Sequence, residues 1–206
     1  NEVYEGKLSQ KESEMRALRA QINPHFLYNS LSLINWKAIE YGQDDISGIT
    51  LALSNYYRTS LNKGKNTLTV KQELSNMESY LNIQQIMHDN SFDVVMDIDE
   101  NVLEYESLNL ILQPLVENAI EHGIDLLTDR RGVITVVAKL HNGLIHIEVK
   151  DNGIGMPKET AHTFLTSESG GYGARNVNDR IRLFYGEQYN LKVSSDENGT
   201  VITIEF

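Results

Sequence analysis

The stretch QINPHFLYNSL, residues 21–31, places a proline inside an expected helix and a histidine directly after it. A proline in a helix interior removes one backbone hydrogen bond and bends or restarts the helix, so Pro24 requires a reason. An ordinary imidazole is mostly neutral at cellular pH, and a neutral ring nitrogen on an exposed face can accept a phosphoryl group. His25 is therefore a candidate nucleophile. The alternative is a partly buried histidine that is hydrogen-bonded within a pair of helices.

The stretch DNGIGM, residues 151–156, follows directly on an expected strand that ends at Lys150. An ionised aspartate only accepts hydrogen bonds, so Asp151 at the end of a strand can pair with an exocyclic amino group such as that of adenine. Gly153 and Gly155 would let the backbone pass close to a ring. The alternative is an ordinary turn, for which Asp-Asn-Gly is a common sequence.

The stretch GGYGARNV, residues 170–177, is a glycine cluster that opens an expected helix. Free backbone N–H groups and the helix dipole make such a start a possible anion site, with Gly171 and Gly173 beside the anion. No Gly-Lys-Ser/Thr follows, so this is not a Walker loop. Asn176 stands where a dinucleotide fingerprint has its third glycine. A glycine-rich loop that merely ends in a helix start is the alternative.

Polar side chains interrupt the apolar helical stretch PLVENAIEHG, residues 114–123. Glu117 and Glu121 share one face at four-residue spacing, as do Asn118 and His122. The amide oxygen of Asn118 is the kind of hard ligand that Mg²⁺ prefers, and such an ion would bridge phosphates. The alternative is a polar surface stripe on an amphipathic helix.

The elements that must position these residues differ between the two parts of the chain. We expect residues 1–64 to be helical, with a second helix that starts at Asp44 or Asp45, followed by the linker NKGKN at 62–66. Residues 65–206 alternate between helical and strand patterns. Helices are expected at 72–88, 108–123 and 174–185, and strands at 91–99, in a hairpin at 133–150 around Asn142-Gly143, and in two closing segments. The predicted fold class is α+β: an N-terminal helical hairpin, then an α/β sandwich with one mixed, mostly antiparallel sheet and helices on one face.

Composition limits the classes of function. The 206 residues are 40% hydrophobic and contain no cysteine, which excludes disulfides and thiolate metal sites. A net charge of −11 argues against nucleic acid as a partner, since binding phosphate backbones requires positive charge. No apolar run approaches the ~18 residues of a membrane span. Because the first residue is Asn1 rather than Met, we expect a fragment of a longer protein.

The order of the motifs resembles the ATP-binding fold shared by histidine kinases, gyrase, the Hsp90 chaperone and MutL. ENAIEHG resembles the N box of that family, DNGIGM its G1 box and GYGARNV its G2 box, with residues 156–170 as the mobile ATP lid. The resemblance implies that Asp151 recognises adenine with support from Thr200 through water, and that Asn118 holds Mg²⁺. It implies a nucleotide-binding site that is formed by the residues Asn118, Glu121, His122, Asp151, Gly153, Gly155, Gly171, Gly173 and Thr200.

The opening stretch LRAQINPHFLYNSLSLI, residues 18–34, closely resembles the phosphoacceptor box of LytS/YesM-type sensor histidine kinases. This resemblance implies that His25 is the phosphorylated residue, that ATP and Mg²⁺ are required, and that the phosphoryl group later passes to an aspartate of a response regulator. Residues 1–64 would be the connector helix and dimerisation/phosphoacceptor domain of a homodimer, and residues 65–206 the catalytic ATP-binding domain. The fragment would be cytoplasmic, and the full-length protein would be anchored in the bacterial membrane through a segment before Asn1.

Several positions depart from the family or carry open roles. Phe26 follows the histidine where many other histidine kinases have an acidic residue, although the LytS/YesM box itself has phenylalanine. Glu117 is the first candidate for the proton acceptor. Glu121 stands where a lysine is common in the N box, which predicts a missing phosphate contact. Asn29, one helical turn from His25, is a candidate for orienting a water in dephosphorylation.

Two other functions are alternatives to histidine kinase activity. An ATP-hydrolysing relative would carry a water-activating glutamate four residues before the Mg²⁺ asparagine, and Pro114 at that position cannot act as a base. A degenerate nucleotide-binding dimeric scaffold without kinase activity is the other alternative, which Glu121 favours.

Pro24 then has a predicted role. Leu8, Met15, Leu18 and Ile22 follow a heptad seam, as in the end of a dimeric connector helix. Continuing that seam would bury His25, whereas a break at Pro24 would turn His25 outward and form a hinge between the connector and the kinase core.

Overall fold

The computed structural model describes residues 24–60, 66–166 and 172–206. The chain divides into two compact units, Asn1–Lys65 and Asn66–Phe206. The predicted heptad seam, the kink before Pro24, most of the predicted linker, and Gly171 lie outside the described residues. The expected domain roles stay predictions.

The described part of the first unit is a pair of helices. Helix α2 spans Pro24–Glu40 and helix α3 spans Asp44–Ser60, with two aspartates in the first turn of α3 as the sequence predicted. The Tyr28 hydroxyl donates to the carbonyl of Tyr57 at 3.1 Å, and Ser47 Oγ donates to Asn35 Oδ1 at 2.7 Å. Hydrogen bonds of this kind fix the register of the two helices against each other, so the helical hairpin is confirmed for the described residues.

The second unit contains one five-stranded sheet in the order β2-β4-β5-β7-β6. The strands are β2 Phe92–Ile98, β4 Gly132–His141, β5 Leu144–Asp151, β6 Lys192–Asp196 and β7 Gly199–Glu205. Only β2 and β4 run parallel, and the other neighbours are antiparallel. The helices are α4 Val70–Met87, α5 Gln113–Asn118, α6 Lys158–Thr163 and α7 Tyr172–Tyr185, with a 3₁₀ turn at Glu100–Val102. The mixed, mostly antiparallel sheet of the predicted α+β class is confirmed.

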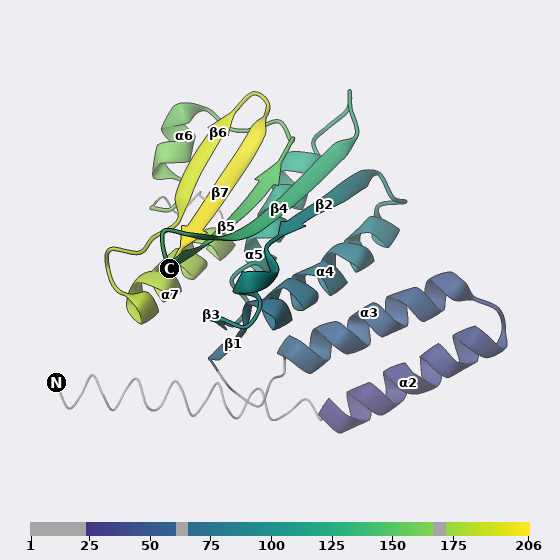
Figure 1. Ribbon diagram of the computed structural model, residues 1–206. Helices are drawn as coiled ribbons and strands as arrows, with labels where there is room; N and C mark the ends of the chain where they lie inside the picture. The colour runs from purple at the N-terminus through teal and green to yellow at the C-terminus, as the bar shows by residue number, and fades with distance from the viewer. Residues whose placement is uncertain (1–23, 61–65, 167–171) are drawn as a thin grey trace, which may run out of the picture. The chain divides into compact units, whose positions relative to one another are not determined.

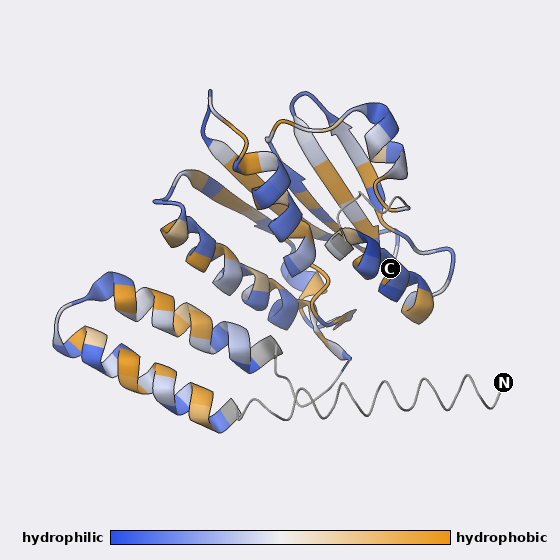
Figure 2. Ribbon diagram, turned by 180° about the vertical axis from the view of Figure 1, so that it is seen from behind, coloured by the Kyte–Doolittle hydropathy of each residue, from blue (hydrophilic) through white to orange (hydrophobic). Residues whose placement is uncertain are grey.

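The core lies between the sheet and the helices α4, α5 and α7, which cover one of its faces (Figures 1 and 2). Alternate residues of β4 and β5 are buried, as the period of two of a strand requires. The largest fully buried side chains include Phe92 of β2, Met77 of α4 and Ile181 of α7. The hairpin turn joins β4 to β5 at Asn142-Gly143, where both residues have positive φ (54° and 83°), as predicted.

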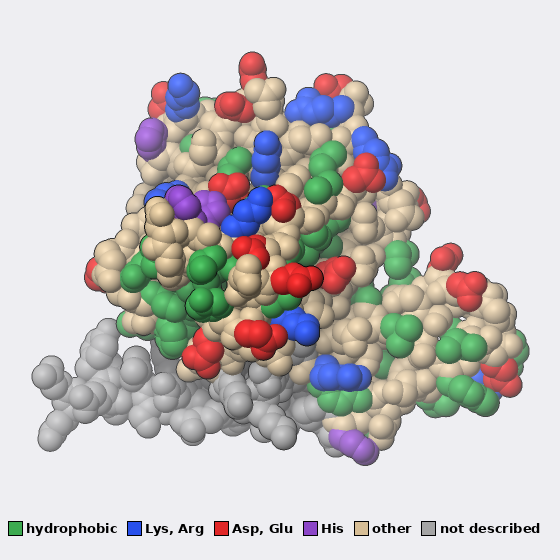
Figure 3. All heavy atoms as spheres, viewed as in Figure 1, with side chains coloured by type: hydrophobic (Ala, Val, Ile, Leu, Met, Phe, Trp, Pro, Cys, Tyr) green, Lys and Arg blue, Asp and Glu red, His purple; other side chains and the backbone are tan. Residues whose placement is uncertain are grey.

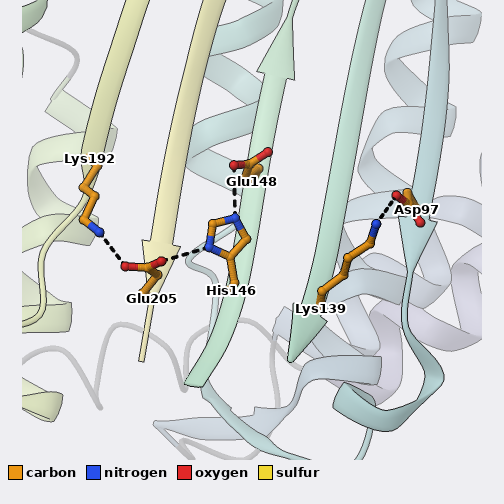
Figure 4. Close-up of polar contacts among 6 residues, drawn as sticks. All are labelled: Asp97, Lys139, His146, Glu148, Lys192 and Glu205. Atoms are coloured by element: carbon orange, nitrogen blue, oxygen red, sulfur yellow. Dashed lines mark hydrogen bonds and ion pairs between the residues drawn. The ribbon is translucent and has the colours of Figure 1, made fainter. Parts of the chain in front are cut away.

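The other face of the sheet is lined with polar side chains that pair across neighbouring strands or, in one case, within strand β5 (Figure 4). The pairs are Lys139–Asp97 at 2.5 Å, His146–Glu148 and His146–Glu205 at 3.0 Å each, and Lys192–Glu205 at 2.5 Å. Basic and acidic side chains are intermixed on this side of the molecule (Figure 3). Exposed pairs contribute little stability individually, so this face is best explained as a solvated surface.

The expected helix at 108–123 is wrong at its start. Residues Glu106–Leu108 form strand β3, which pairs with β1 Thr67–Thr69, and α5 begins only at Gln113. Leu110 has a φ of 56°, outside the right-handed helical region, and Glu73 of α4 binds the backbone N–H groups there. The residues from Gln113 onward are helical as predicted. The contact of the preceding backbone with Glu73, which is distant in sequence, replaces the expected first turn.

Helix α5 continues as a π-helical segment, Ala119–Ile124. The Asp125 N–H donates to the Ile120 carbonyl at 2.9 Å, five residues back. Short π-helical turns are rare and often mark functional positions. In the part of the chain that the structure describes, no helix is long and apolar enough to cross a membrane.

Candidate functional site

A cavity of about 200 Å³ lies between the helical layer and the sheet of the second unit. Its lining is mostly apolar, from the α5 region on one side and β5 and β7 on the other, with segment 155–164 contributing as well. The lining residues are Leu115, Asn118, Ala119, His122, Gly123, Val149, Asp151, Gly155, Met156, Thr160, Phe164, Thr200 and Ile202. Apolar cavities with a few polar groups are typical binding sites for small molecules.

Asp151, the last residue of β5, is the charged side chain at the wall of this cavity and is only 4% exposed. Its Oδ1 accepts hydrogen bonds from the backbone N–H of Gly153 at 2.8 Å and of Thr200 at 3.3 Å. Burial raises the pKa of the Asp151 carboxyl, and these two backbone donors lower it in part. Because both amides bind the same oxygen, Oδ2 is the atom that can accept a hydrogen bond from a ligand.

Glycines allow the backbone to close around Asp151. A Cβ on Gly153 would overlap the backbone of Gly123, and a Cβ on Gly199 would overlap the Asp151 carbonyl. A Cβ on Gly123 would lie 2.8 Å from Asp151 Oδ1. Any larger residue would separate the π-helical segment from the strand ends, so these glycines set the width of the site. The sequence predicted Gly153 as a site residue, whereas Gly123 and Gly199 were not predicted.

Hydrogen bonds from side chains outside the cavity lining hold the loop after β5 in place. Arg130 donates to the carbonyls of Asn152 (3.2 and 2.9 Å) and Gly153 (3.0 Å). Asn152 Oδ1 accepts from the Val133 N–H at 2.7 Å, and its Nδ2 donates to the Arg131 carbonyl at 3.1 Å. The stretch Asp151–Gly153 thus leaves the end of β5 through a bend at Gly153, and Asp151 contributes to the cavity wall.

Thr200 belongs to a hydroxyl network at the same wall. Its Oγ1 lies 2.8 Å from Ser195 Oγ, which also accepts from the Met156 N–H at 2.9 Å and donates to the Gly199 carbonyl at 3.1 Å. The network joins the loop at Met156 to the β6–β7 hairpin. Ser195 was missed because its role depends on a fold contact with a residue 39 positions away.

Asn118 supplies a buried polar group at the helical side of the cavity. Its Nδ2 atom is buried and has no hydrogen-bond partner among the described residues. A buried amide without a partner is costly, which indicates that a ligand completes its bonding. The start of α7 is close by: a Cβ on Gly173 would lie 3.1 Å from Pro114 Cβ and 3.9 Å from Asn118 Nδ2.

The other predicted positions of the N box are placed less centrally. His122 lines the cavity although much of its side chain is exposed, whereas Glu121 is exposed and lies outside the lining. Glu117 accepts a hydrogen bond from Gln113 Nε2 at 2.6 Å and is half-buried. The structure therefore brings together Asn118, His122, Asp151, Gly155 and Thr200, with Gly153 and Gly173 packed directly behind them.

The described residues contain no group of three or more His, Asp or Glu side chains that could hold a metal ion by themselves. A hard divalent cation at Asn118 would take its remaining ligands from water and from ligand oxygens such as phosphates. The Asn118 amide oxygen could supply the one protein ligand, while its Nδ2, unpartnered among the described residues, would suit a phosphate oxygen.

Segment 155–164 contributes Phe164, which was not predicted. Its ring is 7% exposed and packs in the main core while it also lines the cavity. Helix α6 lies in this segment, inside the stretch that was expected to be a mobile lid. The sequence signal that could have identified Phe164 is an aromatic residue within a polar stretch.

His25 lies in the first turn of α2 in the other unit and is exposed. The Asn29 amide lies 3.3 Å from His25 Nδ1, one turn along the helix. The Asn29 side chain can therefore restrict the orientation of the His25 ring.

Comparison with known proteins identifies both parts of the chain. Residues 13–92 match a family model described as histidine kinase. Residues 104–206 match the family described as histidine kinase-, DNA gyrase B- and HSP90-like ATPase. The sensor histidine kinase YesM of Bacillus subtilis is 39% identical over 205 residues, which are 98% of this chain and 35% of that protein. The sensor histidine kinase YpdA of Escherichia coli is 35% identical over 193 residues, 92% of this chain and 33% of that protein. The chain thus spans about a third of the length of these curated relatives.

Solved structures share the fold at low sequence identity. The histidine kinase domain of the blue-light activated kinase EL346 from Erythrobacter litoralis has a TM-score of 0.53 at 18% identity, and covers 88% of this chain and 95% of its own. The structure of histidine kinase ThkA in complex with response regulator protein TrrA has a TM-score of 0.52 at 17% identity, and covers 98% of this chain and 63% of its own.

Replacing Asp151 by Asn should leave the fold as stable as the wild type or make it more stable at neutral pH. Asn Oδ1 can keep both backbone hydrogen bonds while the buried charge is removed. Since the folded-state pKa lies above the ordinary value, ionisation of Asp151 lowers stability as pH rises through that pKa. Denaturant unfolding from pH 4 to pH 8 should show the advantage of D151N shrinking toward low pH. A loss of more than about 1 kcal/mol at pH 7 would contradict the inferred hydrogen bonding.

Two glycines with positive φ allow the packing around the cavity to be separated from backbone strain. Gly143→Ala, at the open hairpin turn (φ +83°), should cost about 1–2 kcal/mol of unfolding free energy through strain alone. Gly155→Ala (φ +64°) should cost roughly 1–3 kcal/mol more, because its Cβ would overlap the Asp196 carbonyl. Denaturant unfolding of both variants measures the difference, and equal losses would show that the loop moves freely.

Proposed function

This chain belongs to the histidine kinase family, and on that premise we propose that it is the kinase core of a two-component sensor kinase. It would bind ATP in the cavity of residues 66–206, transfer the γ-phosphoryl group to His25, and pass it on to an aspartate of a response regulator. The observation that carries the proposal is the buried Asp151 carboxylate, which has one oxygen held by backbone amides and lines an otherwise mostly apolar cavity.

Nucleotide binding follows from the donors and acceptors at the wall. Asp151 Oδ2 would accept from the exocyclic amino group of adenine, and Thr200 would support it through water. The adenine ring would lie against apolar residues such as Leu115 and Ile202. A base with a carbonyl in place of that amino group would meet an acceptor with an acceptor, so the site favours adenine.

Phosphate binding is assigned to the helical side. Asn118 would hold Mg²⁺, which neutralises charge on the phosphates as they transfer. Gly173 lies in the first turn of α7, and the sequence places Gly171 just before that helix. Both would let backbone N–H groups approach the phosphates. His122, at the edge of the cavity, would contact the same part of the ligand. Glu121 offers no positive charge here, so neutralisation depends on the metal ion.

The transfer step forms a bond between phosphorus and a nitrogen of His25 while the bond from the γ-phosphorus to the bridging oxygen of ADP breaks. The imidazole must lose its proton in the process. Nε2 can attack only when the ring proton sits on Nδ1, so Asn29 would turn its amide oxygen toward the Nδ1–H to hold the ring, or would orient a later attacking water. The proton on Nδ1 is then the one that leaves. Glu117 is the proposed proton acceptor. Positioning and electrostatics supply most of the catalysis in such reactions.

A homodimer formed through α2 and α3 is part of the proposal. Large apolar side chains on this hairpin stay exposed in the single chain: Leu33 60%, Trp36 57%, Ile39 61% and Leu51 50%. Apolar side chains gathered in this way on two neighbouring helices indicate a surface that another chain covers. The hydropathy colouring shows hydrophobic positions along both helices (Figure 2).

The remaining partners follow from the class of protein. One solved kinase of this fold is in complex with a response regulator protein, and we assign this chain a partner of that class. We also propose that the full-length protein is anchored in the bacterial membrane through a segment before Asn1, with residues 1–206 in the cytoplasm.

The test is transfer of radiolabel from γ-labelled ATP in the presence of Mg²⁺. The wild type should acquire label that is lost in acid and kept in base, as a phosphorylated histidine requires. His25→Gln should abolish the label, and His141→Gln, an exposed histidine at the end of β4, should leave it unchanged. Label that survives in the His25 variant would refute the assignment. ATP binding without any label on the wild type would favour a non-catalytic scaffold instead.

A further inference from the structure

The segment Asn109–Leu112, between β3 and α5, is held from two sides by charged side chains of opposite sign. On one side is Glu73 of α4, which is 1% exposed. Its Oε2 accepts from the Leu110 N–H at 2.9 Å, and its Oε1 accepts from Ile111 at 2.6 Å and Leu112 at 2.9 Å. Three backbone donors on one buried carboxylate form a strong anchor.

Arg180 of α7 holds the opposite side of the same segment. Its Nη1 donates to the Leu110 carbonyl at 3.2 Å, and its Nη2 donates to the Asn109 carbonyl. Burial raises the pKa of Glu73, and the backbone donors and the positive charge of Arg180 lower it in part. The carboxylate and the guanidinium therefore share one piece of backbone, whose N–H groups face one charge and whose carbonyls face the other.

This segment leads directly into α5, which carries Asn118 five residues after Gln113. The first turn of α7 packs on the same helix, since a Cβ on Gly173 would lie 3.1 Å from Pro114 Cβ. Arg180 is two turns further along α7. The two elements assigned to the phosphates are thus tied to one short segment, and that segment is tied to α4.

We propose that Glu73 and Arg180 are positioning residues for the metal–phosphate end of the nucleotide site. They touch no ligand themselves, and act by fixing α5 and the start of α7 relative to each other. The base end has separate anchors, the backbone N–H groups of Gly153 and Thr200 on Asp151. The proposal rests on the proposed nucleotide function, and it divides the site into two halves with separate supports.

The test compares Arg180→Gln with Arg182→Gln in the full 206-residue chain. Arg182 lies on the same helix and pairs with the exposed Glu187, so it is a matched control. Calorimetry would measure the dissociation constants of adenosine and of a non-hydrolysable ATP analogue with and without Mg²⁺. Arg180→Gln should weaken the Mg²⁺-bound analogue by about fivefold or more, while adenosine affinity changes by less than about twofold. Arg182→Gln should match the wild type for both ligands.

Arg180→Lys and Glu73→Gln extend the test. Lysine keeps the charge but not the forked donors, so it should restore part of the lost affinity. Glu73→Gln replaces one acceptor oxygen with a donor. If this variant folds, it should selectively weaken binding of the Mg²⁺-bound analogue. If it does not fold, Arg180→Gln alone decides the outcome. Equal weakening of adenosine and the analogue in Arg180→Gln, or no difference from Arg182→Gln, would overturn the positioning role alone. A wild type that binds neither ligand would instead overturn the proposed function, and this inference with it.

Discussion

A buried carboxylate must be hydrogen-bonded, and this requirement governs the second unit of the protein at Asp151. The fold supplies two backbone donors to one oxygen and leaves the other facing a mostly apolar cavity. The arrangement lowers stability, because burial disfavours the charged form. It is possible only because Gly123, Gly153 and Gly199 let the π-helical segment and two strand ends meet around the side chain. Carboxylates whose pKa is raised by burial in a cavity are typical of functional sites, which supports the proposed binding role.

Glu73 shows the contrasting use of a buried carboxylate. Both of its oxygens accept backbone hydrogen bonds and the side chain does not line the cavity, so Glu73 serves the scaffold. The two carboxylates lie at different places: Asp151 lines the cavity at the end of β5, and Glu73 binds the backbone just before α5. In the proposed nucleotide site, Asp151 would recognise the base, and Glu73 would help to hold the metal–phosphate end in shape.

The sequence predicted those features that depend on neighbouring residues. Asn142-Gly143 specified the β4–β5 hairpin, and the strand end specified the place of Asp151. Features that depend on distant contacts could not be predicted. The helical pattern from 108 onward is overridden by Glu73, 37 residues earlier in the chain, and Phe164 enters the cavity because of tertiary packing. The short β1–β3 pair lacks enough residues to show a pattern of its own.

Nucleotide selectivity at Asp151 tests the account most directly. The wild type should bind ATP more tightly than ITP, which has a carbonyl where adenine has its amino group. Asp151→Asn presents a donor at the same position, so calorimetric titration should show ATP binding weakened by about tenfold or more and the preference for ATP lost or reversed. The variant keeps both backbone acceptor contacts, so loss of the fold does not confuse the result. An unchanged preference for ATP in Asp151→Asn would contradict the claim that this carboxylate recognises the base.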